Sequence, residues 1–232
     1  MNEACNTIDG LDEFIALCDE HENEMNLEAA RKLYRKSDFD CELCLHHIKQ
    51  LGCPFKVCAY TPEKVCCGCA TLTAAIKYMI GEIHNERFTE RVYRYMPRRK
   101  KKRKKVELLL FYDPLHRIAF YNQYLKLNHQ NAGLISAVYL LTADNELWKY
   151  SWKYIDRDSI SFVKIKPKGL SPEAYILLCA AKDLYLGTEH ISLSELADPI
   201  VIDPIRFRLI VNAMGIRRYG YSFLQCRVGD MS

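Results

Sequence analysis

The distribution of cysteine constrains this chain more than any other feature of its sequence. Seven of the eleven cysteines lie between residues 41 and 69: Cys41, Cys44, Cys53, Cys58, Cys66, Cys67 and Cys69. The first ten residues contain no basic stretch followed by an apolar one, so we expect no secretory signal and a cytoplasmic location. In a reducing compartment, clustered thiols indicate metal binding more strongly than they indicate disulfides.

The spacing of these cysteines is typical of a structural zinc site. Two thiolates separated by two residues bind one tetrahedral ion, and two such pairs complete its coordination. We expect Cys41 and Cys44 to act with two of Cys66, Cys67 and Cys69. Cys53 and Cys58 are alternative ligands, or hold a second ion with His46 or His47. An iron–sulfur cluster also uses four thiolates, and reduced cysteine without metal is the third interpretation. The N-terminal half thus resembles a generic cysteine-rich zinc module.

Charge divides the 232-residue chain into three parts. The formal net charge is +4, yet residues 98–105 are eight consecutive cations: Arg98, Arg99, Lys100, Lys101, Lys102, Arg103, Lys104 and Lys105. Composition is otherwise that of a globular protein, with 49% apolar and 27% charged residues, which excludes a wholly disordered tail or a fibre. We therefore predict a cysteine-bearing module over residues 1–97, a polybasic linker over 98–105 and a second domain over 106–232.

The polybasic linker predicts contact with a polyanion. Eight like charges repel one another, and phosphates relieve that repulsion while releasing counterions. Nucleic acid or a nucleoprotein is therefore the expected partner. We also expect Arg87, Arg91 and Arg94 to extend the patch, with Tyr93 and Tyr95 placed to stack on bases. A nuclear-import address, an acidic protein groove and a plain solvated linker are the other interpretations.

The rest of the sequence predicts a fold that is mainly α with minor β. Asp113-Pro114, Ser171-Pro172 and Asp203-Pro204 each place a capping side chain before a proline, which is typical of a helix start. Further helices are expected to begin near Thr71 and Asn131. Gly187 and Gly215 are expected helix ends, and the Ser171 helix, apolar almost all round, is expected at the centre. Three segments resemble strands: 106–112, 160–165 and 221–228. No stretch is long and apolar enough to predict a membrane span.

The sequence predicts no catalytic residues. It contains none of the common nucleotide-binding, serine-hydrolase or zinc-protease motifs. Asp113 and His116 are better explained by helix capping than by acid–base chemistry, and His190 is expected at the surface. The aromatic segment of residues 148–154 has two interpretations. As a helix it gives a core stripe of Trp148, Trp152 and Ile155, which we favour; as a strand it gives an aromatic face for bases.

Residues 108 to about 214 resemble an uncharacterised bacterial domain family, found as small proteins carried on mobile elements. The resemblance is carried by four segments: Phe111-x-Asp113-x-x-His116-Arg117, Ala137-x-Tyr139-Leu140-Leu141-x-Ala143, Ser171-Pro172 leading to Asp183-Leu184-Tyr185-x-Gly187, and Asp203-Pro204 to Gly215. Lys168-Gly169-Leu170 departs from the family, which often has a Trp-Gln-Thr-like stretch there. The resemblance implies a domain boundary but no activity.

Together these features predict a non-enzymatic accessory or regulatory protein that contacts nucleic acid through residues 98–105. The alternative is an inhibitor or adaptor of a mobile element or phage, which binds a host defence or replication protein.

Overall fold

A computed structural model describes residue 44 and residues 57–96 and 109–228. This part of the chain is 63% helical and has almost no strands. The mainly α expectation is therefore confirmed. The helices, in chain order, are α3 (Thr61–Cys66), α4 (Leu72–Met79), α5 (Glu86–Tyr95), α7 (Pro114–Tyr124), α8 (Ala132–Leu141), α9 (Asn145–Ser151), α10 (Pro172–Leu186), α11 (Leu193–Ala197) and α12 (Pro204–Tyr219), with 3₁₀ turns η3 (Trp152–Tyr154), η4 (Phe162–Lys164) and η5 (Gly220–Gln225).

Local capping starts most of these helices where the sequence places them. The side chains of Thr71, Asp113, Asn131 and Ser171 each accept a hydrogen bond from the backbone N–H three residues later. Asp203 accepts two such bonds at the start of α12. Each cap satisfies an N–H of the first turn that has no partner inside its helix. The predicted starts are therefore confirmed.

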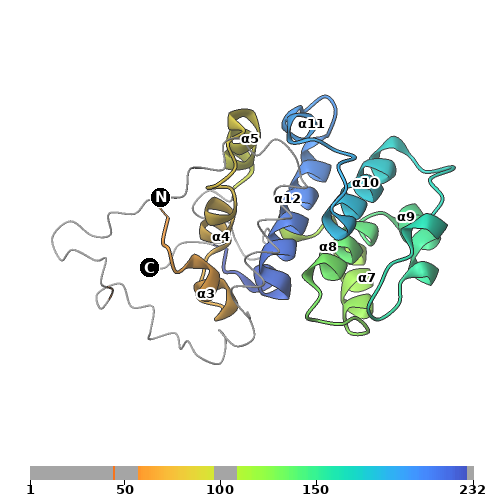
Figure 1. Cartoon of the computed structure of the whole chain (residues 1–232), viewed down its shortest axis with the longest axis horizontal. Coiled ribbons are helices and arrows are strands. Elements are labelled where there is room, and N and C mark those ends of the chain that lie inside the picture. The colour runs from red at the N-terminus through yellow and green to blue at the C-terminus, as the bar shows by residue number, and fades with distance from the viewer. Residues whose placement is uncertain (1–43, 45–56, 97–108, 229–232) are drawn as a thin grey trace.

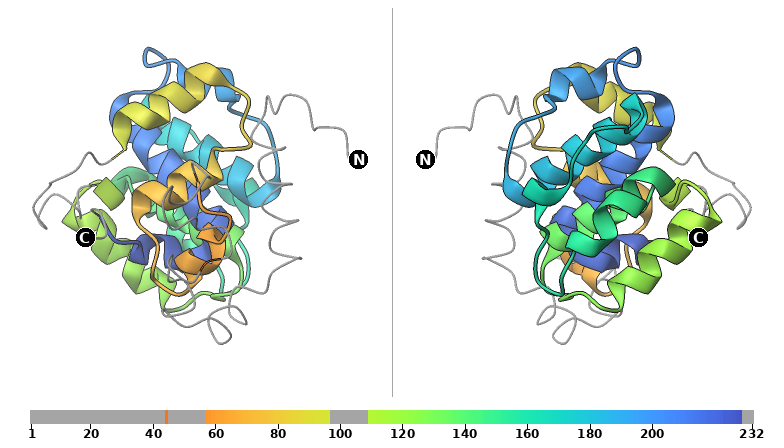
Figure 2. Two further views of the ribbon diagram at one scale, coloured as in Figure 1. Left: turned by 90° about the vertical axis from the view of Figure 1, so that its left-hand side faces the viewer. Right: turned by 90° about the vertical axis from the view of Figure 1, so that its right-hand side faces the viewer.

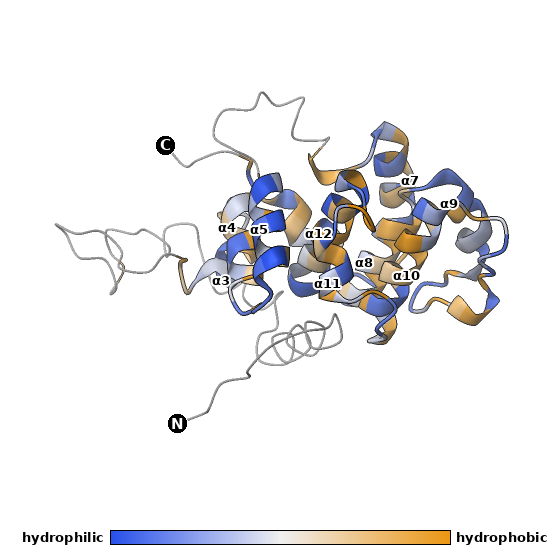
Figure 3. Cartoon of the chain, turned by 90° about the horizontal axis from the view of Figure 1, so that it is seen from above, coloured by the Kyte–Doolittle hydropathy of each residue, from blue (hydrophilic) through white to orange (hydrophobic). Residues whose placement is uncertain are grey.

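The centre of the core is α8. All ten of its residues are buried, and α10 and α12 pack on it with the most extensive contacts. In Figure 3 the apolar colour is concentrated on α8, α10 and α12, whereas α5 is largely hydrophilic. The expectation that the Ser171 helix, α10, is the central one is corrected, because Tyr175 and Leu186 leave part of its surface exposed.

Helices α3 to α5 pack against α12 and α11. Figures 1 and 2 show them along one side of α12, with α5 beside α11. Val65 of α3 and Phe88 of α5 belong to the same hydrophobic cluster as Leu134 of α8. The described residues before and after the polybasic linker therefore share one core, while the linker itself lies outside the described residues.

A C-terminal segment joins the two sides of this core. Arg227 forms a parallel bridge with Thr71: its N–H donates to Ala70 O, and its carbonyl accepts from Leu72 N–H. The Arg227 guanidinium also donates to Cys69 O at 2.5 Å. This bridge holds the loop after α3, which carries Cys69, against the last described residues before position 229.

Several sequence-based expectations about secondary structure are wrong. Residues 162–164 and 220–225 form 3₁₀ turns rather than strands, and bridges within the described ranges are isolated. In the predicted strand over residues 106–112, Leu109 and Leu110 are helical. Thr61-Pro62 opens α3, since proline fits the first turn of a helix.

Gly187 ends α10 in the left-handed conformation, as expected. Gly215, however, does not end α12, which continues to Tyr219. The glycine is required there by packing, because a Cβ would lie 2.6 Å from Cδ2 of Phe223 and closer still to Cε2 and Cζ. None of the helices in the described part of the chain is both long and apolar enough to cross a membrane.

Candidate functional site

The predicted metal ligands lie partly outside the structure. Cys41 and Cys53 belong to the residues that are not described, as do His46 and His47. Among the described residues, no three Cys, His, Asp or Glu side chains are grouped so that they could hold a metal ion. Cys44, Cys58, Cys66, Cys67 and Cys69 therefore do not form a complete site by themselves. The metal module stays a prediction.

The fold brings an additional cysteine toward α3. Cys66 and Cys226 are both buried, and their thiols lie close enough to interact electrostatically. Burial, with a smaller contribution from Cys66, raises the pKa of the Cys226 thiol to about 12. Cys226 is therefore protonated at neutral pH, and a metal ion would have to displace that proton. Because these cysteines are 160 positions apart, sequence spacing does not reveal their proximity.

The predicted extension of the cationic patch is wrong at Arg91. Its side chain is buried beneath α11, where Nη1 donates to the carbonyls of Leu196 at 2.6 Å and Asp198 at 3.0 Å. Nη2 donates to the carbonyl of Ile202, and the guanidinium lies 4.1 Å from the ring centre of Phe207. The buried guanidinium of Arg91 thus binds its own chain and is not accessible to a phosphate.

Two of the remaining residues near the linker are at the surface. Tyr93 is exposed, and Arg94 is exposed beside Glu90, with which it forms an ion pair at 3.5 Å. Tyr95 packs against Phe207 at 5.4 Å between ring centres and is only partly exposed. The cations of residues 98–105 lie outside the described residues.

His116 is a structural residue. Its Nδ1 accepts from the N–H of Tyr112 at 3.0 Å, which leaves Nε2 to donate to the carbonyl of Tyr139 at 2.9 Å. Burial lowers the pKa of His116 to about 4, so the ring is neutral at physiological pH. With both ring nitrogens bonded to backbone, His116 has no atom left for acid–base chemistry. The capping role predicted for Asp113 is confirmed.

Asp183 and His190 form a second polar centre, at the end of α10. The fully buried carboxylate accepts from the hydroxyl of Thr188 at 2.8 Å and from the backbone N–H groups of His190 and Ile191. It also forms a hydrogen bond with Nδ1 of His190 at 2.7 Å. These bonds fix the loop after Gly187 and orient the partly exposed imidazole, so Asp183 is committed to holding the loop.

A groove at the start of α10 combines positive charge with an apolar floor. It has a volume of about 600 Å³, within the ordinary range of ligand-binding clefts, and is open to solvent. Its lining consists of Lys166, Pro167, Lys168, Leu170, Pro172 and Tyr175. No acidic residue occurs from 159 to 172, where Lys164, Lys166 and Lys168 alternate with other residues. The charged groups that line the groove are therefore all positive.

Exposed tyrosines flank this groove. Tyr175 of α10 has 48% of its surface exposed. Tyr150 of α9 is 42% exposed, and its hydroxyl lies 3.8 Å from where a Cβ on Gly169 would be. Gly169 of the lysine-bearing loop has a φ of +90°, a conformation that favours glycine. Sequence reasoning missed this groove, although its alternating lysines without acidic neighbours are visible in the sequence.

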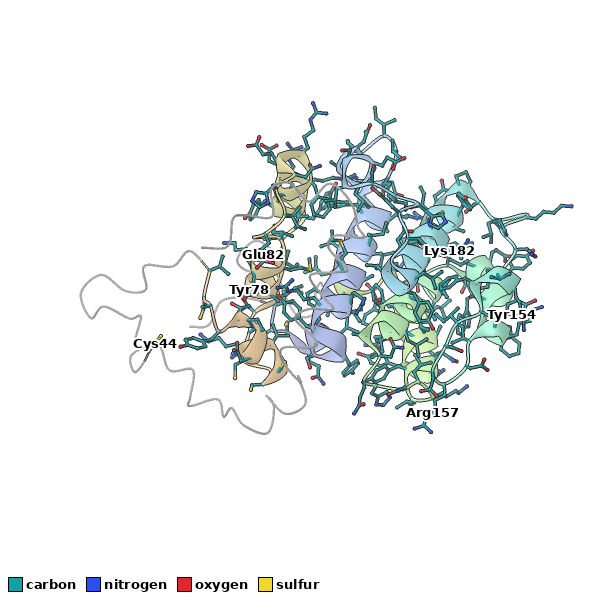
Figure 4. All side chains as sticks on the ribbon, in the orientation of Figure 1. Cys44, Tyr78, Glu82, Tyr154, Arg157 and Lys182 are labelled. Carbon is teal, nitrogen blue, oxygen red and sulfur yellow. The ribbon has the colours of Figure 1, made fainter. Side chains whose placement is uncertain are left out.

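The predicted aromatic core stripe is only partly correct. Ile155 is buried and Trp148 packs against the core, but Trp152 is 57% exposed. The stripe fails because α9 ends at Ser151 and tightens into a 3₁₀ turn, which rotates Trp152 away from the α-helical position. The alternative strand, with one aromatic face, is also wrong because the segment is helical. In Figure 4, Tyr154 of this segment and Cys44 lie at opposite ends of the molecule.

No protein-family model, curated protein or solved structure matches this chain. The resemblance of residues 108–214 to a bacterial domain family therefore stays a prediction, and the functional argument depends on the residues of this chain alone.

Proposed function

We propose that this chain is a non-enzymatic accessory protein of the cytoplasm that contacts nucleic acid or a nucleoprotein through Arg98–Lys105. The eight consecutive cations are the observation that carries the proposal. The other 224 residues have a formal charge of −4, so attraction for a polyanion is concentrated in this one segment. The lysines of the groove at the start of α10 add positive charge on a different part of the chain.

Ordering of the cysteine-bearing module by zinc is part of this proposal. The ligands would be Cys41 and Cys44 with two of Cys66, Cys67 and Cys69. In support, Cys66 and Cys69 are buried at the end of α3, and the bridge between Thr71 and Arg227 anchors the loop that follows. Structural zinc contributes folding free energy on the order of 10 kcal/mol to such a module. An iron–sulfur cluster is the alternative occupant.

The test is the salt dependence of polynucleotide binding by the full chain. If six of the cations meet phosphates of duplex DNA, the logarithm of the binding constant falls with the logarithm of salt concentration with a slope of roughly −5. A variant with all eight residues of Arg98–Lys105 changed to glutamine should lose most of this affinity. Binding that is insensitive to salt, or unchanged in the glutamine variant, would contradict the proposal.

A second function, binding to a protein target, is favoured by the outer face of α7. Leu115 and Ile118, which are about one turn apart on α7, and Leu125, which follows its last residue, are all exposed. An apolar stripe of this kind suits the helix face of a protein-binding adaptor. Stoichiometric capture of a protein partner that persists in the glutamine variant, and is lost on changing Ile118→Lys, would favour this function over the first.

A further inference from the structure

The groove at the start of α10 has features that a simple basic patch lacks. Its lining includes Lys166 and Lys168, while Pro167, Leu170 and Pro172 contribute to its apolar surface. A phosphate backbone needs only the cations, so the apolar floor has no role in binding it. A ligand that uses the whole groove therefore has a negative charge next to a flat or apolar group.

The tyrosine of the groove lies near the start of α10 and has about half of its surface exposed. A tyrosine side chain has only two rotatable χ angles, so it loses little conformational freedom when another ring stacks on it. Base–aromatic stacking tolerates every base because each base has a π face.

We propose that this groove binds an unpaired nucleotide of single-stranded nucleic acid, with its base against Tyr175 and the neighbouring phosphates near Lys166 and Lys168. This inference rests on the proposed function and specifies the kind of nucleic acid involved. In a duplex the faces of the bases are covered by neighbouring bases, so only the lysines would contribute. The groove therefore confers a preference for single strands over duplexes.

Charge favours this occupant over an apolar peptide. The loop from residue 159 to residue 172 has three lysines and no acidic residue, and the groove has no carboxylate in its lining. An acidic peptide meets the same charge requirement but offers no planar ring for Tyr175. Binding of poly-glutamate is therefore the competing outcome of the experiment below.

The experiment measures the affinity of the full chain for a fluorescent oligothymidine and for a duplex of equal length, at one salt concentration. Loss of stacking in Tyr175→Ala should weaken binding of the single strand about tenfold and leave duplex binding unchanged. Tyr175→Phe keeps the ring and should retain most of the affinity. Tyr112→Ala removes an exposed tyrosine outside the groove and serves as the matched control.

The lysines give an independent measurement. Lys166→Gln with Lys168→Gln should reduce the magnitude of the single-strand salt slope by about 1.4, since each phosphate contact on a single strand contributes about 0.7. Lys126→Gln, an exposed lysine at the end of α7, should leave that slope unchanged. Thermal unfolding confirms that each variant is folded.

The outcomes separate this inference from the function on which it rests. If the wild-type chain binds neither polynucleotide, both proposals are wrong. If it binds but Tyr175→Ala has the wild-type affinity for the single strand, the proposal for the groove is wrong, while the proposal for the polybasic segment is unaffected. Poly-glutamate binding that depends equally on Tyr175 would assign the groove to acidic peptides and would also overturn the inference.

Discussion

Replacing Gly215 by alanine tests the packing of α12 against the turn that follows it. In an exposed helix, glycine to alanine stabilises by about 1 kcal/mol through helix propensity. Here the new methyl group would lie 2.6 Å from Cδ2 of the buried Phe223 ring, closer than real Cβ atoms approach other atoms. Overpacking of this kind costs about 1–3 kcal/mol. The clash therefore offsets or outweighs the gain that propensity predicts, and we expect a net loss of up to about 2 kcal/mol.

Urea unfolding followed by circular dichroism measures this change, and a double-mutant cycle identifies its cause. Phe223→Leu shortens the side chain that the methyl group meets, so Gly215→Ala should cost at least about 1 kcal/mol less in that background than in the wild type. At 232 residues, a loss of up to about 2 kcal/mol corresponds to a decrease in Tm of up to roughly 8 °C. An increase in stability for the single variant would refute the reasoning, since the two residues would then not be in contact.

Three further predictions concern buried polar groups and the metal. The pKa of His116 is about 4 in the folded chain and about 6.5 in the unfolded chain. Neutral His116 therefore contributes about 3 kcal/mol to the free energy of unfolding above pH 6.5, and this contribution is lost as the pH falls toward 4. A His116→Gln variant should show a correspondingly weaker loss between these pH values in urea titrations, and an identical loss would contradict the assignment. Arg91→Leu should destabilise by about 3 kcal/mol or more by leaving buried carbonyls unpaired, whereas Arg94→Leu should change unfolding little. Elemental analysis of the purified chain should find about one zinc or more per molecule, and less than half an equivalent of zinc or iron would exclude the metal module.

The elements that were predicted correctly depend on contacts between near neighbours in the sequence. Asp113, Asn131 and Ser171 each cap a helix through an N–H three residues away, so a few letters of sequence contain the whole interaction. The errors depend on distant contacts. Arg91 bonds to carbonyls more than 100 residues away, and Gly215 is determined by a ring that arrives only when η5 folds back on α12. Neither partner can be identified from periodicity.

The groove at the start of α10 could be predicted only in part from the sequence. Its lysines are evident from the sequence, because Lys164, Lys166 and Lys168 occur in a stretch without acidic residues. Their value as a site depends on Tyr150 and Tyr175, which come from different helices. Tyr150 of α9 lies near Gly169 of the lysine-bearing loop, and Tyr175 follows that loop on α10. The sequence therefore reveals the charge of such a site but not its aromatic surface.

The buried arginines show that a formal positive charge in this chain is not always available to a ligand. Arg91 and Arg217 are almost fully covered, and each donates to a backbone carbonyl at or near a helix end, at Leu196 and at Leu184. The planar guanidinium suits this role because it offers several donors in fixed directions. Lys166 and Lys168 remain exposed, and their compact ammonium groups act as point charges. Because the groove attracts phosphates through lysine, we expect its affinity to depend strongly on salt and only weakly on base identity.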